Sequence, residues 1–144
     1  MIYLDTSFLM PLFRQEEVSE SIGNFLATRV TGSLVVSQWT RVELASVIAR
    51  DVRMKSLDET TAHKLLEACD ALIEESLHLL IPTAADFNLA HDFVSNFATK
   101  LRGPDALHLA IACNHGVEEI LTLDDGLLFA AKKLKIKARR GIRS

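Results

Sequence analysis

The sequence predicts an α/β fold of three layers, in which helices cover both faces of a central, mostly parallel sheet of four to five strands. Short runs rich in Val, Ile and Leu alternate along the chain with longer segments of helical periodicity, an order typical of parallel sheets. The hydrophobic share is 49% and the aromatic share only 6%, so we expect a core built mainly of aliphatic side chains. At 144 residues, with no linker or repeat, residues 1–144 are expected to form one domain.

The strands are expected where short apolar runs end at a polar or turn residue. They are predicted at residues 2–4, 33–37, 78–81, 119–123 and, as a short edge strand, 136–138. Helices are predicted at 16–30, from 38 to about 54, from 56 to about 75, from 83 to about 100, from 105 to 115, and from 124 to about 134.

Capping patterns mark where these helices begin. Thr6 or Ser7 is expected to cap a short helix after the first strand, with Pro11 in its first turn or ending it. Ser37 is expected to cap the helix that follows the second strand, and the inward positions predicted there are Val42, Ala45 and Ala49. Capping boxes are predicted at SLDE (56–59) and at Thr83 with Asp86, and Gly103-Pro104 is a break before the next helix.

Several classes of protein are disfavoured by the composition. No apolar run approaches the ~20 residues of a membrane helix, and the N-terminus lacks the basic region of a signal peptide, so a cytoplasmic protein is expected. Cys69 and Cys113 lie far apart in helical patterns and are expected to be reduced core residues. The five histidines show no metal-ligand spacing, which disfavours a zinc enzyme.

The net charge of −3 hides an uneven distribution. Residues 132–144 hold seven Lys or Arg and no acid, whereas the rest of the chain holds nine bases and 19 acids. This basic C-terminal end can bind nucleic acid phosphates, or it can be a solvated last helix with a loose tail. The candidate RNA-binding residues are Lys100, Arg102, Lys132, Lys133, Arg139 and Arg140.

Four acidic residues stand where an open α/β sheet builds its active site. Asp5 and Asp124 follow the first and fourth main strands, whereas Glu43 and Asp105 lie in helical segments. Ligands of such sheets bind outside the carboxyl ends of the strands, so we expect the four carboxylates to converge there. Gathered carboxylates repel one another unless a cation holds them, which points to Mg²⁺ or Mn²⁺ and to phosphate chemistry.

Each acid also has a structural explanation when taken alone. An Asp after a strand is often an N-cap, which suits Asp5 and one of Asp124 or Asp125, and an Asp in the first helical turn, as at Asp105, is favoured by the helix dipole. Glu43 can be a solvated helix residue, although it lies within an apolar run.

Four local motifs in order make the chain resemble a PIN-domain ribonuclease of the VapC toxin type. They are IYLDTS at the start, TRVELA around Glu43, LRGPDALHLA around Asp105 and LTLDD before the last helix. The resemblance spans nearly the full length and implies a PIN-like fold. It also implies a metal-dependent endoribonuclease that hydrolyses RNA phosphodiester bonds with a metal-activated water, a VapB-like antitoxin partner and a homodimer.

By position, the resemblance implies that Asp5, Asp105 and Asp124 are metal ligands. Glu43 would ligate a second ion or orient the nucleophilic water. Thr6 or Ser7 and Thr122 would be supporting hydroxyl residues, and Asp125 would be a secondary ligand or a helix cap.

Other functions remain as alternatives. A catalytically silent PIN module that binds RNA or protein is the main one. An aspartate-nucleophile phosphatase is disfavoured because Ser7 stands where a DxD motif has its second Asp, and no GxxxxGK[ST] loop of a P-loop NTPase is present.

Overall fold

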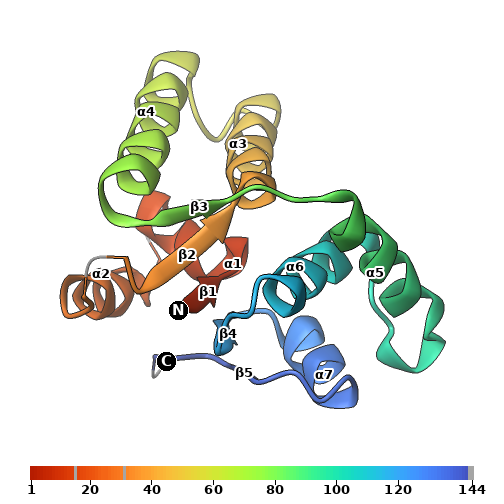
Figure 1. The fold of residues 1–144 in the computed structure, drawn as a ribbon. Helices are drawn as coiled ribbons and strands as arrows, with labels where there is room; N and C mark the ends of the chain where they lie inside the picture. Colours follow the sequence, from red (N-terminus) through yellow and green to blue (C-terminus); the bar gives the residue numbers. More distant parts are fainter. Residues whose placement is uncertain (15, 31, 143–144) are drawn as a thin grey trace.

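A central five-stranded parallel sheet organises the fold, as predicted (Figure 1). The computed structural model describes residues 1–14, 16–30 and 32–142. The sheet has the order β3-β2-β1-β4-β5 and every neighbouring pair is parallel. The strands are β1 (Ile2–Leu4), β2 (Leu34–Ser37), β3 (His78–Leu80), β4 (Glu119–Leu121) and β5 (Ala138–Arg139). The predicted edge strand therefore exists, shifted slightly toward the C-terminus.

The helical elements follow the predicted order, most of them with shorter bounds, whereas α6 begins two residues before the predicted start at 105. They are α1 (Thr6–Leu9), the 3-10 turn η1 (Met10–Phe13), α2 (Ser19–Ala27), α3 (Gln38–Arg53), α4 (Glu59–Ser76), α5 (Ala84–Ser95), the 3-10 turn η2 (Phe97–Thr99), α6 (Gly103–Asn114) and α7 (Asp125–Lys133). None of these helices is both long and apolar enough to cross a membrane.

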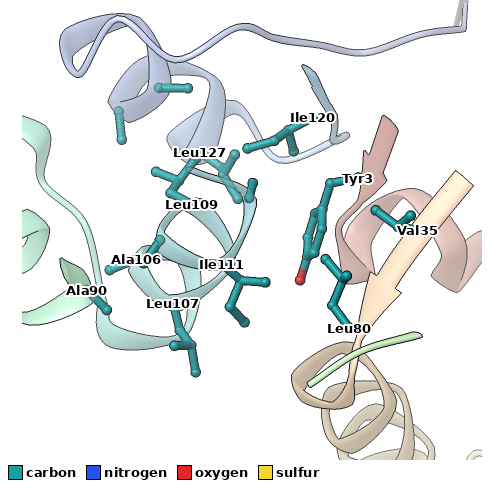
Figure 2. Close-up of a cluster of buried hydrophobic side chains, with 14 residues drawn as sticks. Tyr3, Val35, Leu80, Ala90, Ala106, Leu107, Leu109, Ile111, Ile120 and Leu127 are labelled. Carbon is teal, nitrogen blue, oxygen red and sulfur yellow. The ribbon is translucent and has the colours of Figure 1, made fainter. Parts of the chain in front are cut away.

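The two faces of the sheet pack against different helices because alternate strand residues point to opposite sides. Tyr3, Val35 and Ile120 pack with residues of α5, α6 and α7 on one face, as Figure 2 shows. Leu4 and Val36 pack on the other face with residues of α1 to α4. The aliphatic three-layer core that composition predicted is thus present.

Several local expectations are corrected. Asp5, rather than Thr6 or Ser7, caps α1, because its side chain accepts from the Phe8 amide. Asp58 caps α4 through the Thr61 amide, so no capping box starts at Ser56.

The predicted inward face of α3 is also wrong. Thr40, Leu44 and Ile48 are its buried residues, whereas Val42 is 56% exposed and Ala49 is exposed. The predicted cap at Ser37 is confirmed and forms a capping box with Thr40, and the capping box at Thr83 with Asp86 is confirmed.

Three further expectations need adjustment. Helix α5 ends at Ser95, well before residue 100, where the chain turns into η2. Cys69 is buried and Cys113 exposed, and both are free, so only the first is a core residue. Arg143, the last base of the basic end, lies outside the described residues.

The chain changes direction at β1, and this creates the place for a site. From β1 the chain moves to β2 and β3 on one side, then crosses to β4 and β5 on the other. Ile2, Tyr3 and Leu4 pair with residues 119–121 of β4, so the carboxyl ends of β1 and β4 lie level. A crevice outside such a switch point is where open α/β sheets bind ligands.

Candidate functional site

An acidic cavity of about 390 Å³ lies at the carboxyl ends of β1 and β4. Asp5, Glu43, Asp105 and Asp124 all contribute to its wall, so the structure brings together the four acids that the sequence singled out. Thr6 and Ser7 line it as well. The acids come from four different elements: the ends of β1 and β4 and the helices α3 and α6.

Asp5 is fixed at the bottom of this cavity. Its backbone amide donates to Leu121 O of the neighbouring strand (3.1 Å), which extends the pairing of β1 with β4. Its Oδ1 accepts from the Ser7 hydroxyl (2.7 Å) and from the Phe8 amide (3.2 Å). Burial raises the pKa of Asp5, while the nearby imidazole of His108 and these hydrogen bonds oppose the rise. A carboxylate in this setting gains from a cation nearby.

A pair of hydroxyls joins the two strand ends. Ser7 Oγ and Thr122 Oγ1 are 3.1 Å apart, and the Leu123 amide donates to Ser7 Oγ (2.9 Å). Since the single Ser7 proton goes to Asp5, Thr122 is the donor to Ser7. Thr122 also accepts from the Asp124 amide (3.0 Å). The two supporting hydroxyls predicted at these positions thus hold Asp5 and Asp124 in fixed relation.

Glu43 is held by two side chains from different elements. Thr6 donates to Glu43 Oε1 (2.6 Å), and Nε2 of His108 makes a short hydrogen bond to the same oxygen. Because an ionised carboxylate only accepts, a neutral His108 carries its proton on Nε2 and accepts at Nδ1. Glu43 is therefore oriented by α1 and by α6, and is not a free surface residue.

A buried hydrogen-bond chain continues behind His108. The Tyr3 hydroxyl lies 2.6 Å from His108 Nδ1 and 2.8 Å from Ser37 Oγ, and Tyr3 and His108 are 0% and 1% exposed. Burial raises the pKa of Tyr3, against hydrogen bonds from Ser37 and Thr40, so its hydroxyl keeps its proton and can donate to His108. Although His108 lies within LRGPDALHLA, its role was not predicted, because a single His in an apolar helix has no diagnostic spacing.

Asp105 stands in the first turn of α6 without a hydrogen bond from any other described residue to its carboxylate. Burial, with the nearby charges of Asp124 and Asp5, raises its pKa from 3.8 to about 6. The repulsion expected between gathered carboxylates therefore contributes, together with burial, to the raised pKa of Asp105.

Asp124 and Asp125 have separate roles. Asp124 caps α7, with its Oδ1 accepting from the Leu127 amide (3.0 Å), and it lines the cavity. Asp125 has a side chain that is 92% exposed and pairs with Arg140 (3.2 Å), outside the cavity wall. Asp125, the acid whose role was left open, therefore lies outside the wall of the acidic cavity.

The predicted RNA-binding residues differ in their contacts, and none of them lines the acidic cavity. Arg139 is bound in a fork by Glu119, both distances being 2.9 Å. Lys100 and Lys133 lie 5.6 and 5.5 Å from the centre of the Phe129 ring. The remaining candidates, Arg102, Lys132 and Arg140, are exposed or half-buried.

One basic residue of the site was missed. Arg14, at the end of η1, is the only Lys or Arg among the described residues that line the acidic cavity. A lone Arg between two helical segments carries no pattern that sequence reasoning can use.

The donor set has the chemistry of a hard divalent cation, because it offers carboxylate and hydroxyl oxygens. Hydrogen bonds engage Asp5 Oδ1, Asp124 Oδ1 and Glu43 Oε1, and no buried side-chain N or O in the described chain lacks a partner. The second oxygens of these carboxylates are therefore open to the cavity. As the side chains stand, no three acidic, His or Cys groups among the described residues enclose one cation position.

Comparison with known proteins gives one family match. Residues 2–133 match the PIN domain family. No curated protein matches the chain.

Similar solved structures share the fold at low identity. VapC20 of Mycobacterium tuberculosis, described as a sarcin-ricin loop cleaving toxin, is 16% identical, with a TM-score of 0.73 over 90% of this chain and 95% of that one. FitAcB from Neisseria gonorrhoeae is 20% identical, with a TM-score of 0.70 over 98% of both chains. VapBC2 from Rickettsia felis, bound to a promoter DNA fragment, is 14% identical, with a TM-score of 0.65 over 96% of this chain and 98% of that one.

Proposed function

The chain belongs to the PIN-domain family, and from this premise we propose that it is a divalent-metal-dependent endoribonuclease and the toxin of a VapBC-type toxin–antitoxin pair. The observation that carries the proposal is the acidic cavity, where Asp5, Glu43, Asp105 and Asp124 meet at the switch point of the sheet. The names of the structural neighbours, among them a toxin that cleaves the sarcin-ricin loop, support the same function.

Asp5, Asp105 and Asp124 would hold the cation, with Glu43 as a further ligand or as the group that orients water. A bound Mg²⁺ or Mn²⁺ would supply charge that neutralises the phosphate oxygens and lowers the pKa of water. The raised pKa of Asp105 supports this assignment, because it results from burial and from the neighbouring carboxylates, and a bound cation would offset both.

The chain's own residues would position the reactants. The Thr6 hydroxyl and His108 fix one oxygen of Glu43 and leave the other free to accept a proton from water. Tyr3, fully buried, holds the far side of the imidazole, so the ring cannot rotate away without losing a hydrogen bond. The hydroxyl pair Ser7–Thr122 would hold the Asp5 carboxylate beside the backbone of Asp124.

Cleavage of RNA by the purified protein tests the enzyme assignment. We expect cleavage with Mg²⁺ or Mn²⁺, none with EDTA, and a large loss of activity in Asp5→Asn and Asp105→Asn. Asp125→Asn is the matched control, since its exposed carboxylate lies outside the cavity and activity should persist. Activity in the first two variants equal to that of wild type would contradict the assigned site. Sequencing RNA ends after brief expression would then identify the target.

A second candidate is a silent PIN module that binds RNA or protein. It is favoured by the fact that no three acidic, His or Cys groups of the described chain enclose one cation position. Calorimetric titration with Mn²⁺ separates the two candidates. Heat of binding that disappears in Asp5→Asn favours the enzyme, whereas no binding together with no cleavage favours the silent module.

The partners of the toxin are part of the same proposal. We expect a VapB-like antitoxin to bind the chain and to block cleavage, and we expect a homodimer. Exposed Phe87 (57%) and Phe97 (87%) offer apolar surface of the kind that partners cover. Co-expression with the neighbouring reading frame tests the first expectation, and light scattering of the purified protein tests the second.

A further inference from the structure

Arg14 lines the acidic cavity, whose wall also contains Glu16, two residues after it in the chain. It ends η1, and the cavity that it lines also contains Asp5, Glu43, Asp105 and Asp124. An RNA phosphate that approaches these carboxylates meets negative charge on most sides. Among the described residues, the Arg14 guanidinium is the one basic group in the wall.

The guanidinium of Arg14 is held in a fixed position by α3. Its Nε donates to Asp51 Oδ2 (3.1 Å), and its Nη2 donates to both Asp51 oxygens (2.8 and 2.9 Å). These bonds leave Nη1 without a partner in the described chain, and the side chain is 37% exposed. The fork faces Asp51, and the anchored Nη1 is left to donate to a phosphate with little further loss of side-chain freedom.

Apolar side chains adjoin Arg14 in the same wall. Val18 and Val47 both line the cavity, on the chain just after Arg14 and on α3 respectively. Together they offer a surface for the sugar and base of a nucleotide, beside a donor for its phosphate.

We propose that Arg14, anchored by Asp51, binds a phosphate of single-stranded RNA next to the one that is cut, with the nucleotide resting against Val18 and Val47. This inference rests on the proposed ribonuclease function and adds the residue that directs the strand across the cavity. Arg14 is thus a substrate-binding residue, and Asp51 is a positioning residue that acts through it.

The chain contains a matched control for this proposal. Arg41 also forms a fork with an aspartate, its Nε and Nη2 lying 2.7 and 3.3 Å from Asp70 oxygens. This pair joins α3 to α4 and is absent from the wall of the acidic cavity. Arg14→Ala and Arg41→Ala therefore remove the same side chain, change the net charge equally and leave one aspartate unpaired each.

Binding is measured in an Asp105→Asn background, so that the RNA stays intact. The probe is a short, fluorescent, mixed-sequence single-stranded RNA, followed by anisotropy in Mg²⁺ at several salt concentrations. We expect Arg14→Ala to weaken binding about tenfold and to lower the salt slope by about 0.7, the value for one phosphate contact on a single strand. Arg41→Ala should change neither quantity appreciably.

Further variants separate binding from folding. Arg14→Lys keeps the charge without the fork and should give an intermediate loss, and Asp51→Asn should weaken binding less than Arg14→Ala although it breaks the same ion pair. Urea unfolding of each variant shows whether it is folded. If Arg14→Ala does not fold, Arg14→Lys and Asp51→Asn carry the comparison.

Steady-state cleavage in the wild-type background distinguishes failure of this inference from failure of the function. A rise in KM with little change in kcat for Arg14→Ala supports the inference. Two results would overturn the role of Arg14 and leave the ribonuclease function intact. One is cleavage by the wild type with an unchanged KM in Arg14→Ala, and the other is an equal loss of RNA affinity in Arg14→Ala and Arg41→Ala. A wild-type protein that neither binds nor cuts RNA overturns both.

Discussion

Replacing Asp105 by Asn should stabilise the protein at neutral pH when no divalent cation is present. Burial and the neighbouring carboxylates raise the pKa of Asp105 from 3.8 to about 6. At about 1.4 kcal/mol per pKa unit, the ionised form costs folding up to about 3 kcal/mol. Since the side chain is partly exposed and solvent screens it, we expect the Asn variant to gain about 1–2 kcal/mol.

The pH dependence of this gain follows from the direction of the shift. The folded protein holds the Asp105 proton more tightly than the unfolded chain, so the wild type loses stability as pH rises from about 4 to about 6. Below this window both states are protonated and the two proteins should be equally stable. The advantage of Asp105→Asn should therefore grow across the window and stay constant above it.

Urea unfolding in EDTA at a series of pH values measures the effect. Asp125→Asn is the matched control, because Asp125 also lies in the first turn of a helix but has a side chain 92% exposed. Addition of Mg²⁺ should stabilise the wild type and narrow its difference from Asp105→Asn. An Asn variant that is no more stable than the wild type at neutral pH, or a stability difference that does not change with pH, would contradict a raised pKa at Asp105.

Three further substitutions have defined outcomes. Tyr3→Phe leaves an imidazole nitrogen buried without its hydroxyl partner and should cost about 1–3 kcal/mol in urea unfolding. Ser7→Ala removes the link between the two strand ends and should reduce Mn²⁺ affinity in calorimetry, a result that an unchanged affinity would contradict. Gly141→Ala places a Cβ 2.9 Å from a Leu121 methyl group at a position where φ is +75°. It should lower the free energy of unfolding more than Gly116→Ala does, because Gly116 has a similar φ of +68° but open space around it.

The order of strands and helices could be predicted because it depends on local patterns. IYL stands directly before Asp5 and the run EILTL directly before Asp124, and these two runs supply adjacent strands in the structure. The phase of α3 could not be predicted, because its apolar residues lie all around the helix. Leu44 and Ile48 face the core, whereas Val42 faces solvent.

The acids of the site could be predicted, but not the groups that hold them. Asp5 and Asp124 follow strands, Asp105 lies in the first turn of a helix and Glu43 lies further along one, so their places are readable from neighbours in sequence. His108 contacts residues 65 and 105 positions away, and Arg14 contacts a residue 37 positions away. Such contacts are set by how the helices pack on the sheet, which a single sequence does not display.

Asp5 and Asp124 each cap the start of a helix and each line the cavity. The backbone amides that donate to these two carboxylates can therefore report on binding in the cavity. The Phe8 amide donates to Asp5 Oδ1, and the Leu127 amide donates to Asp124 Oδ1. A ligand that draws either carboxylate away would loosen the first turn behind it, and that amide would exchange its hydrogen with solvent faster. An NMR titration following these two signals would thus register occupancy of the cavity without any substrate being turned over.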